Sequence, residues 1–180
     1  MPTSAFIVEV PSAEALVGDL RERFDSTAQL GVPAHVTVLY PFMDPAYVTP
    51  AVLQKARTAL VSVSSFEFSL EGVGRFRTTA YLAPFPLVPF TAMTASLAQA
   101  FPEFPPYGGE HAGSIPHLTV AHGDVIHAEV AAAELEDRLR LYGPIETHCS
   151  SVVLIENSTG RWGRMHVFHL PAAVNEARDT

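Results

Sequence analysis

An internal repetition constrains the fold most, because the same order of secondary structure is predicted twice along the chain. Hydrophobic alternation and helical periodicity predict strand, helix, strand, helix and strand in residues 5–75, and the same order again in residues 78–156. One further strand is expected over residues 162–170. The repetition predicts an α+β protein in which residues 1–180 form a single domain, with two pseudo-symmetric lobes on either side of a cleft.

The expected elements follow from β-branched runs, amphipathic stretches and the prolines and glycines between them. Strands are expected over residues 5–10, 35–42, 65–76, 78–83, 115–121, 151–156 and 162–170. Helices are expected from residue 12 to a stop at Gly31, and over residues 45–61, 87–101 and 125–141. Pro84 and Pro86 are expected to end the strand before them, because proline lacks the amide hydrogen that a sheet ladder uses.

The composition excludes several classes of protein. Apolar residues make up 48% and charged residues 17% of the chain, which suits a packed core and is too apolar for a disordered chain. No apolar run approaches the ~20 residues of a membrane span, and the amino terminus lacks the features of a signal peptide. Cys149 is the single cysteine, and we interpret it as a small apolar core residue. We therefore expect a cytoplasmic protein that does not engage a membrane.

The net charge of the chain indicates which kind of phosphate-containing partner it suits. The net charge is −8, whereas proteins that depend on non-specific phosphate contacts are usually basic. Lys55 is the single lysine among 11 Lys and Arg residues, and arginine suits bidentate contacts with phosphate. For a protein that acts on phosphates, this balance favours a local pocket for a small nucleotide or a short RNA end over a long nucleic-acid groove.

The third segment of each repeat carries a His-x-Thr tripeptide in an apolar context, after a proline. The first copy contains His35 and Thr37, and the second contains His117 and Thr119. Residues i and i+2 of a strand point the same way, so each strand presents an imidazole and a hydroxyl to one ligand. Two such strands suit phosphodiester transfer without a metal: one neutral histidine accepts a proton from the attacking group, and the other, as imidazolium, donates one to the leaving oxygen. The threonine hydroxyls would bind the non-bridging phosphate oxygens.

The same residues also fit a purely structural interpretation. Half-buried histidines and β-branched threonines are both ordinary in strands. Alternation along the first motif strand places Leu39 on the face of His35 and Thr37, and it places Tyr40 and Phe42 on the opposite, core face. The residue pattern by itself leaves both interpretations open.

These motifs and their flanks resemble the two-histidine (2H) phosphoesterase superfamily, and in particular its 2′-5′ RNA ligase-like (LigT-like) family. The resemblance covers nearly the whole chain and is carried by HVTVLYPF at residues 35–42, PHLTVA at 116–121, the proline-rich loop 101–109, VVLIE at 152–156 and the following Gly160-Arg161-Trp162. It implies a bilobal α+β fold with antiparallel sheets around a central groove.

The resemblance also implies a function. It implies metal-independent action, with no cofactor, on 2′,3′-cyclic or 2′-5′ phosphodiester bonds of RNA ends or small nucleotides. By position, His35 and His117 would be the catalytic acid and base, and Thr37 and Thr119 would bind the phosphate; which histidine is the base stays open. The alternative is a non-catalytic module that binds a nucleotide or an RNA end in the same groove. No feature indicates an obligate protein partner, and we expect a monomer.

Three further side chains are candidate substrate contacts. Arg161 and Trp162 follow the expected strand 151–156, where they could supply a phosphate fork and a base-stacking surface. Arg75 lies at the junction of the lobes and could reach the groove. For each of them the structural interpretation, an arginine in solvent or a tryptophan packed on a sheet, is the favoured one.

A metal-dependent hydrolase is the third interpretation. His111, His117, His122 and His127 lie near Asp124 in the sequence. Their spacings suit a ligand set poorly, because His117 and His122 would face opposite sides of a strand. We therefore predict no metal site.

Overall fold

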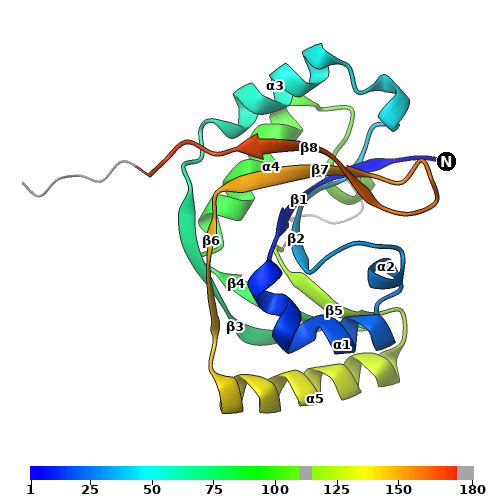
Figure 1. The fold of residues 1–180 in the computed structure, drawn as a ribbon, viewed down its shortest axis with the longest axis vertical. Helices are drawn as coiled ribbons and strands as arrows, with labels where there is room; N and C mark the ends of the chain where they lie inside the picture. Colours follow the sequence, from blue (N-terminus) through cyan, green and yellow to red (C-terminus); the bar gives the residue numbers. More distant parts are fainter. Residues whose placement is uncertain (110–114, 174–180) are drawn as a thin grey trace, which may run out of the picture.

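A computed structural model describes residues 1–109 and 115–173 of the chain (Figure 1). The strands are β1 (Ser4–Glu9), β2 (His35–Phe42), β3 (Phe66–Phe76), β4 (Thr79–Phe85), β5 (Leu118–His122), β6 (Ile145–Cys149), β7 (Ser151–Glu156) and β8 (Gly163–His169). The α-helices are α1 (Glu14–Phe24), α2 (Ser26–Gln29), α3 (Pro50–Leu60), α4 (Val88–Ala100) and α5 (Val125–Tyr142). Short 3-10 turns lie at Pro11–Ala13, Pro45–Tyr47 and Pro106–Gly109.

The strands form two four-stranded antiparallel sheets, so the α+β architecture is confirmed. The first sheet has the order β2-β1-β7-β8 and the second has the order β5-β4-β3-β6. The sheets do not coincide with the two sequence repeats, because the last strand of each repeat pairs in the other sheet. Strand β3 pairs with β4 of the second repeat, and β7 pairs with β1 of the first. The repeat boundaries stay a prediction, but this exchange of strands ties the two halves into one unit.

Helices α1 and α4 likewise each pack against the half to which they do not belong in sequence. Helix α1 connects two strands of the first sheet but packs against β5 and α5 of the second half. Helix α4 connects two strands of the second sheet but packs against β2 and α3. Figure 1 shows the result, with α3 above the first sheet, α4 behind β7 and β8, and α1 and α5 beside the second sheet.

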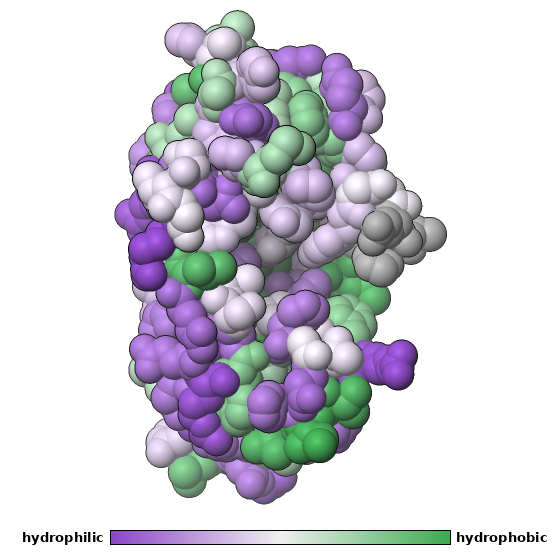
Figure 2. Space-filling view, turned by 90° about the vertical axis from the view of Figure 1, so that its right-hand side faces the viewer, coloured by the Kyte–Doolittle hydropathy of each residue, from purple (hydrophilic) through white to green (hydrophobic). Residues whose placement is uncertain are grey.

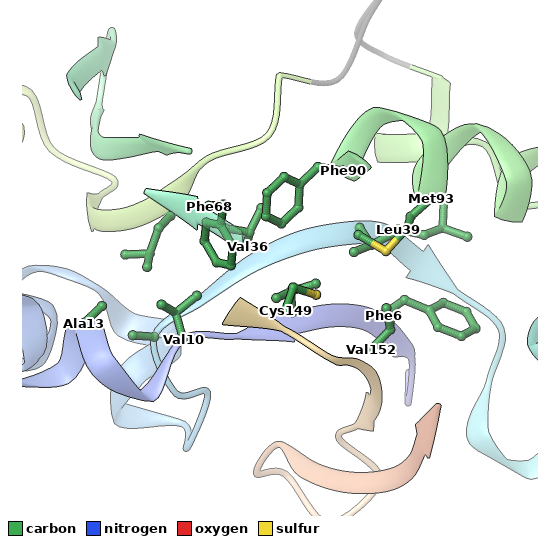
Figure 3. Close-up of a cluster of buried hydrophobic side chains, with 14 of the residues drawn as sticks. Phe6, Val10, Ala13, Val36, Leu39, Phe68, Phe90, Met93, Cys149 and Val152 are labelled. Atoms are coloured by element: carbon green, nitrogen blue, oxygen red, sulfur yellow. The ribbon is translucent and has the colours of Figure 1, made fainter. Parts of the chain in front are cut away.

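One hydrophobic core joins the two halves. Its buried residues come from both sheets and from the helices, as the close-up in Figure 3 shows for Phe6, Val36, Phe68, Phe90 and Cys149. The rings of Phe68 and Phe90 meet edge to face, with their centroids 5.1 Å apart. Cys149 is 2% exposed, so its interpretation as a small apolar core residue is confirmed, and burial raises the pKa of its thiol to about 12.

Several strand boundaries differ from the sequence predictions. Strand β4 continues through Pro84 to its end at Phe85, because the pairing of β4 with β5 stops at Leu82 and leaves that side of the strand open. Strand β5 begins at Leu118, so His117 lies directly before the ladder and not inside it. The strand β6 was not predicted, although its alternating sequence contained the signal.

Candidate functional site

The two His-x-Thr segments lie on the edges of the two sheets, and these edges meet. Strand β2 is the outermost strand of its sheet, β5 is the outermost strand of the other, and the two strands contact each other. The surface is hollowed near the middle of the molecule, where the two halves adjoin (Figure 2). The fold therefore brings together two motifs that are about eighty residues apart in the sequence.

A β-bulge follows the threonine in both motifs. In the pairing of β2 with β1, the register skips Val38, directly after Thr37. In the pairing of β5 with β4, the register skips Val120, directly after Thr119. A bulge re-aims the side chains that follow it and is common next to active sites. The pseudo-symmetry of the site therefore extends to this backbone irregularity.

The first bulge corrects the expected alternation along β2. Leu39 does not share the face of His35 and Thr37 but is 1% exposed in the core. Tyr40, expected in the core, is 39% exposed and its ring meets that of Trp162 edge on, with centroids 6.2 Å apart. Phe42 is buried as expected. The extra residue shifts the alternation by one position, which places Tyr40 on the site's side of the strand.

The two histidines are held in the same way. Nδ1 of His35 lies 2.8 Å from the carbonyl oxygen of Pro33, and Nδ1 of His117 lies 2.7 Å from the carbonyl oxygen of Ile115. A carbonyl oxygen can only accept a hydrogen bond, so Nδ1 of each ring carries a hydrogen and donates it. Nε2 of each neutral ring is left with its lone pair, as the atom that can exchange a proton with a ligand.

The electrostatics of the pair favour neutral imidazoles. Burial lowers the pKa of His35 to about 4, against the effect of the bond to Pro33, and burial also lowers the pKa of His117. The positive charge of protonated His117 further lowers the pKa of His35, so the two rings lie within electrostatic reach of each other. A bound anion between them would offset both effects.

The two threonine hydroxyls are available to a ligand. Thr37 and Thr119 are half-buried, and neither hydroxyl has a hydrogen-bond partner within residues 1–109 and 115–173. The partly buried Thr94, by contrast, donates to the carbonyl oxygen of Val38 over 2.8 Å. Unpaired hydroxyls beside two imidazoles are suitable donors to a phosphate.

Aromatic rings lie against His117, and sequence reasoning missed them. Tyr81 stacks on Phe76 with centroids 4.6 Å apart, and the His117 ring lies 5.2 Å from Tyr81 and 5.3 Å from Phe76. The Tyr81 ring crosses β3 at Gly74, where a Cβ atom would stand 2.2 Å from Tyr81 Cζ. The signal in the sequence was the glycine itself, because a glycine inside a strand often marks the close approach of another group.

The three candidate substrate contacts have other partners. Arg161 donates from Nη1 to the carbonyl oxygen of Gln29 over 3.1 Å. The backbone N–H of Trp162 donates to the carbonyl oxygen of Leu30 over 2.9 Å. The Trp162 ring, beside Tyr40, is the one of the three that lies near the site.

Arg75 forms ion pairs with α5 and does not reach the groove. Its Nη2 lies 2.9 Å from a Glu136 carboxylate oxygen, and its Nε lies 3.7 Å from Glu129, both on α5. Arg75 stands opposite Ala80, which packs against α5, so its side chain lies on the helix-covered face of the sheet.

Among the residues that the structure describes, no three His, Cys, Asp or Glu side chains stand close enough to hold a metal ion. His111 lies outside the described residues. Sequence reasoning placed His122 on the opposite face from His117, but the bulge at Val120 resets the alternation between them. His122 bonds through Nδ1 to the Thr79 hydroxyl over 2.9 Å, and its charge lowers the pKa of His117.

The chain carries its two His-x-Thr segments at the adjoining edges of two antiparallel sheets, and it shares this α+β fold with the solved structures of TT0787 and LigT. The model of the 2′-5′ RNA ligase superfamily matches residues 8–161, and the chain belongs to this superfamily. Membership supports an enzyme of the phosphoesterase or RNA-ligase kind. No curated protein matches the chain.

Solved structures share the fold at low sequence identity. The protein TT0787 of Thermus thermophilus superimposes with a TM-score of 0.61 at 16% identity, over 96% of this chain and all 100% of that one. E. coli LigT in complex with NADP+ gives 0.56 at 14% identity, over 94% of this chain and 99% of that one. LigT in complex with 3′-AMP gives 0.55 at 12% identity with the same coverage of 94% and 99%. Within the described residues, no helix is both long and apolar enough to cross a membrane.

Proposed function

We propose that the protein is a metal-independent phosphodiesterase of the 2′-5′ RNA ligase-like kind, acting on 2′,3′-cyclic or 2′-5′ phosphodiester bonds of RNA ends or small nucleotides. The observation that carries the proposal is the matched pair of imidazoles. His35 and His117 each donate from Nδ1 to the backbone, and within residues 1–109 and 115–173 neither Nε2 has a hydrogen-bond partner. His35 lies on β2 and His117 directly before β5, and these two strands contact each other. This arrangement supplies a proton acceptor and a proton donor on either side of one small ligand.

Hydrolysis of a 2′,3′-cyclic phosphate needs one proton removed and one supplied. Water attacks phosphorus while Nε2 of one histidine takes its proton, and the bond from phosphorus to one ribose oxygen breaks as the other imidazolium protonates that oxygen. We assign the base to His35, whose lower pKa of about 4 keeps it neutral, and the acid to His117. After this step His35 holds the proton taken from water and His117 has lost its own, and proton exchange with solvent returns both rings to the starting state.

The remaining groups of the site fit a nucleotide phosphate. The hydroxyls of Thr37 and Thr119 would donate to the non-bridging oxygens, where negative charge builds up in the transition state. The stacked rings of Tyr81 and Phe76 offer a surface for a base next to His117. The complex of E. coli LigT with 3′-AMP supports a mononucleotide-sized ligand for this fold.

The net charge of −8 favours small nucleotides or short RNA ends over long RNA. A cytoplasmic location and a monomeric state stay predictions from the sequence.

The test is incubation of the purified protein, in the presence of a chelator, with the four nucleoside 2′,3′-cyclic monophosphates, followed by separation of the 2′- and 3′-phosphate products. We expect one product isomer, formed at a rate that the chelator does not change. Activity that chelation abolishes would contradict the mechanism. Saturable binding of a nucleotide without turnover of any cyclic substrate would favour the binding-module alternative.

A further inference from the structure

The three residues before His35 are held from inside the protein by two side chains of α1. Nη2 of Arg21 donates to the carbonyl oxygen of Val32 over 3.1 Å. The backbone N–H of Ala34 donates to Oε1 of Glu14 over 2.6 Å. The residue between them, Pro33, accepts the hydrogen bond from the His35 ring. The carbonyl oxygen of Val32 and the N–H of Ala34 are therefore bound to α1, and the carbonyl oxygen of Pro33 is bound to the imidazole that follows. The two remaining polar backbone groups are bound elsewhere: the Val32 N–H donates to the Thr27 carbonyl oxygen over 3.0 Å, and the Ala34 carbonyl oxygen accepts from the Val10 N–H over 2.8 Å.

The charged group beneath this segment is unusually deeply buried. Arg21 is 2% exposed and Asp25 is 1% exposed, and Nη2 of Arg21 lies 3.0 Å from Asp25 Oδ2. Asp25 also caps α2 by accepting from the backbone N–H and the hydroxyl of Thr27 over 3.0 Å and 2.8 Å. Burying an ion pair costs desolvation energy that a well-packed apolar pair would avoid. Stability alone therefore gives little reason for Arg21 at this place.

The residues just before this segment are held from outside. In the turn between β7 and β8, Arg161 donates to the carbonyl oxygen of Gln29, and the backbone N–H of Trp162 donates to the carbonyl oxygen of Leu30. Gly31 has a φ of +98°, and a Cβ atom there would stand 3.2 Å from the carbonyl oxygen of Trp162. The approach to His35 is thus fixed between α1 and the β7–β8 turn.

We propose that Arg21 and Glu14 are positioning residues for His35: they hold residues 32–34 so that Pro33 fixes the imidazole and Nε2 points to the ligand. The catalytic part of this inference rests on the proposed function. Neither residue touches the ligand in this scheme. A displacement of about 1 Å at a reacting group can cost a hundredfold in rate, so support of this kind has a large effect on turnover.

Arg21 also acts on the charge of His35. The charged and titratable groups around this imidazole are Arg21, Glu14 and Asp25 from α1 and its carboxyl end, the cross-strand partner Glu9 on β1 with its ion-pair partner Arg164, and His117 across the groove. Of these, Arg21 and protonated His117 disfavour a second positive charge on His35, and Asp25 favours it. Because Arg21 and Asp25 act on the pKa of His35 in opposite directions, removing each charge in turn should shift that pKa in opposite directions.

The first experiment measures the pKa of His35 by NMR, from the pH dependence of its ring carbon–proton signals. Arg21→Met should raise the pKa of His35 toward 6.5, because the disfavouring charge is lost and Asp25 is left unpaired. Asp25→Asn keeps an acceptor for the α2 cap but leaves Arg21 unpaired, and should keep His35 neutral to lower pH than in the wild type. His117, titrated in the same spectra, should move less than His35. General loosening would expose His35 and raise its pKa in both variants, and that outcome would overturn the electrostatic part.

The second experiment separates positioning from stability through Glu14. Glu14→Ala removes the acceptor for Ala34 and should lower kcat about tenfold with little change in KM, whereas Glu14→Gln keeps an acceptor and should restore most of the rate. Arg138→Met is the matched control, because Arg138 bonds to the Leu16 carbonyl oxygen and Asp19 on another face of α1. It should lower stability and leave kcat and the His35 pKa unchanged. Equal losses of kcat in the Ala and Gln variants, or in Arg138→Met, would overturn the proposal.

The two experiments keep the proposals apart. The NMR titration needs no turnover, so it tests the role of Arg21 even in a protein without phosphodiesterase activity. If Arg21→Met does not fold, the pKa of His35 in Asp25→Asn still gives the result.

Discussion

Around His35 the support comes from charged side chains beneath the strand, whereas around His117 aromatic rings lie against the imidazole itself. His35 follows a segment bonded to the buried Arg21 and to Glu14. His117 instead contacts Tyr81 and Phe76 at ring distances of 5.2 Å and 5.3 Å. The local geometry of the motifs, with the Nδ1 bond and the bulge after threonine, is nevertheless the same in both.

The comparison separates two kinds of property in a repeated motif: the local backbone geometry, which is the same in both copies, and the surroundings of each imidazole, which differ. The backbone of the motif sets the tautomer and aims the side chains, so it stays the same in both copies. The surroundings set the charge of each imidazole and the shape of each side of the site, so they differ. We therefore expect variants within the motifs to have similar effects in the two halves, and variants of the surroundings to have different ones.

The largest expected effect is the loss of either imidazole. His35→Ala and His117→Ala should each lower kcat/KM by about 10²–10⁴-fold, because each ring transfers one of the two protons. The measurement is the rate of cyclic nucleotide hydrolysis, with circular dichroism and thermal denaturation to show that the fold is retained. A variant of either histidine with the full wild-type rate would contradict the two-histidine mechanism.

The next largest effect is expected from the threonines. Thr37→Val and Thr119→Val should each lower kcat by about 10²-fold. Valine keeps the β-branched shape and removes only the hydroxyl, so the substitution tests the bond to the phosphate oxygens. The variants should change kcat more than the Kd of the product nucleotide, measured by calorimetry. Unchanged rates would assign the hydroxyls to the structure alone.

The pH dependence should reveal the two imidazoles separately. His35 as base must be neutral, so kcat/KM should fall as the pH decreases through about 4. His117 as acid must be protonated, so kcat/KM should fall about tenfold per pH unit above its pKa, which lies below the ordinary 6.5. The optimum of kcat/KM is therefore expected on the acid side of pH 6.5. An optimum above pH 7 would contradict these environments.

Gly74→Ala should affect the half of the site around His117. A Cβ atom at this position would stand 2.2 Å from Cζ of Tyr81, so the ring must leave its place beside His117. Stacking on an aromatic ring contributes about 1–3 kcal/mol per base, so we expect nucleotide Kd to rise about tenfold. Gly72→Ala on the same strand is the control, because its Cβ atom would meet Ala83 at an ordinary 3.6 Å. Equal Kd values in the two variants would exclude the aromatic surface from binding.

The smallest effect is expected on the far face of α1, where Arg138 lowers the pKa of Asp19 from 3.8 to about 2. A lowered carboxyl pKa stabilises the folded state above pH 3.8, and the stabilisation is lost as the pH falls from there toward 2. Asp19 is 56% exposed, so Asp19→Asn should cost less than about 1 kcal/mol at pH 7. Urea unfolding should show a smaller difference from the wild type at pH 2.5 than at pH 7.

Part of the site could not be predicted because strand alternation is reset by the bulges. From the sequence, Tyr40 was placed in the core and His122 opposite His117, since both predictions counted residues through Val38 or Val120. A signal was present, because an apolar pair follows the threonine in each motif and interrupts the alternation. Whether such a pair is a bulge or the end of a strand depends on the neighbouring strand, which the local sequence does not specify.

Arg21 gave a similar signal that sequence reasoning did not use. It lies on the apolar face of α1 next to Leu20 and between Val17 and Phe24, with an acidic partner four residues later at Asp25. A charge at a core position with a partner one turn away indicates a buried pair. That this pair lies beneath His35 follows only from the packing of α1 across the segment that precedes β2.

The sequence by itself determined the two His-x-Thr motifs, the order of most helices and strands, and the α+β class, because hydrophobic periodicity and strand geometry are local properties. The tertiary structure decided which strands pair, which faces the side chains after the bulges occupy, and which residues surround each imidazole. Those outcomes depend on burial between segments far apart in the chain. The crossing of β3 and β7 into opposite sheets and the place of Arg21 beneath His35 are set by that long-range packing.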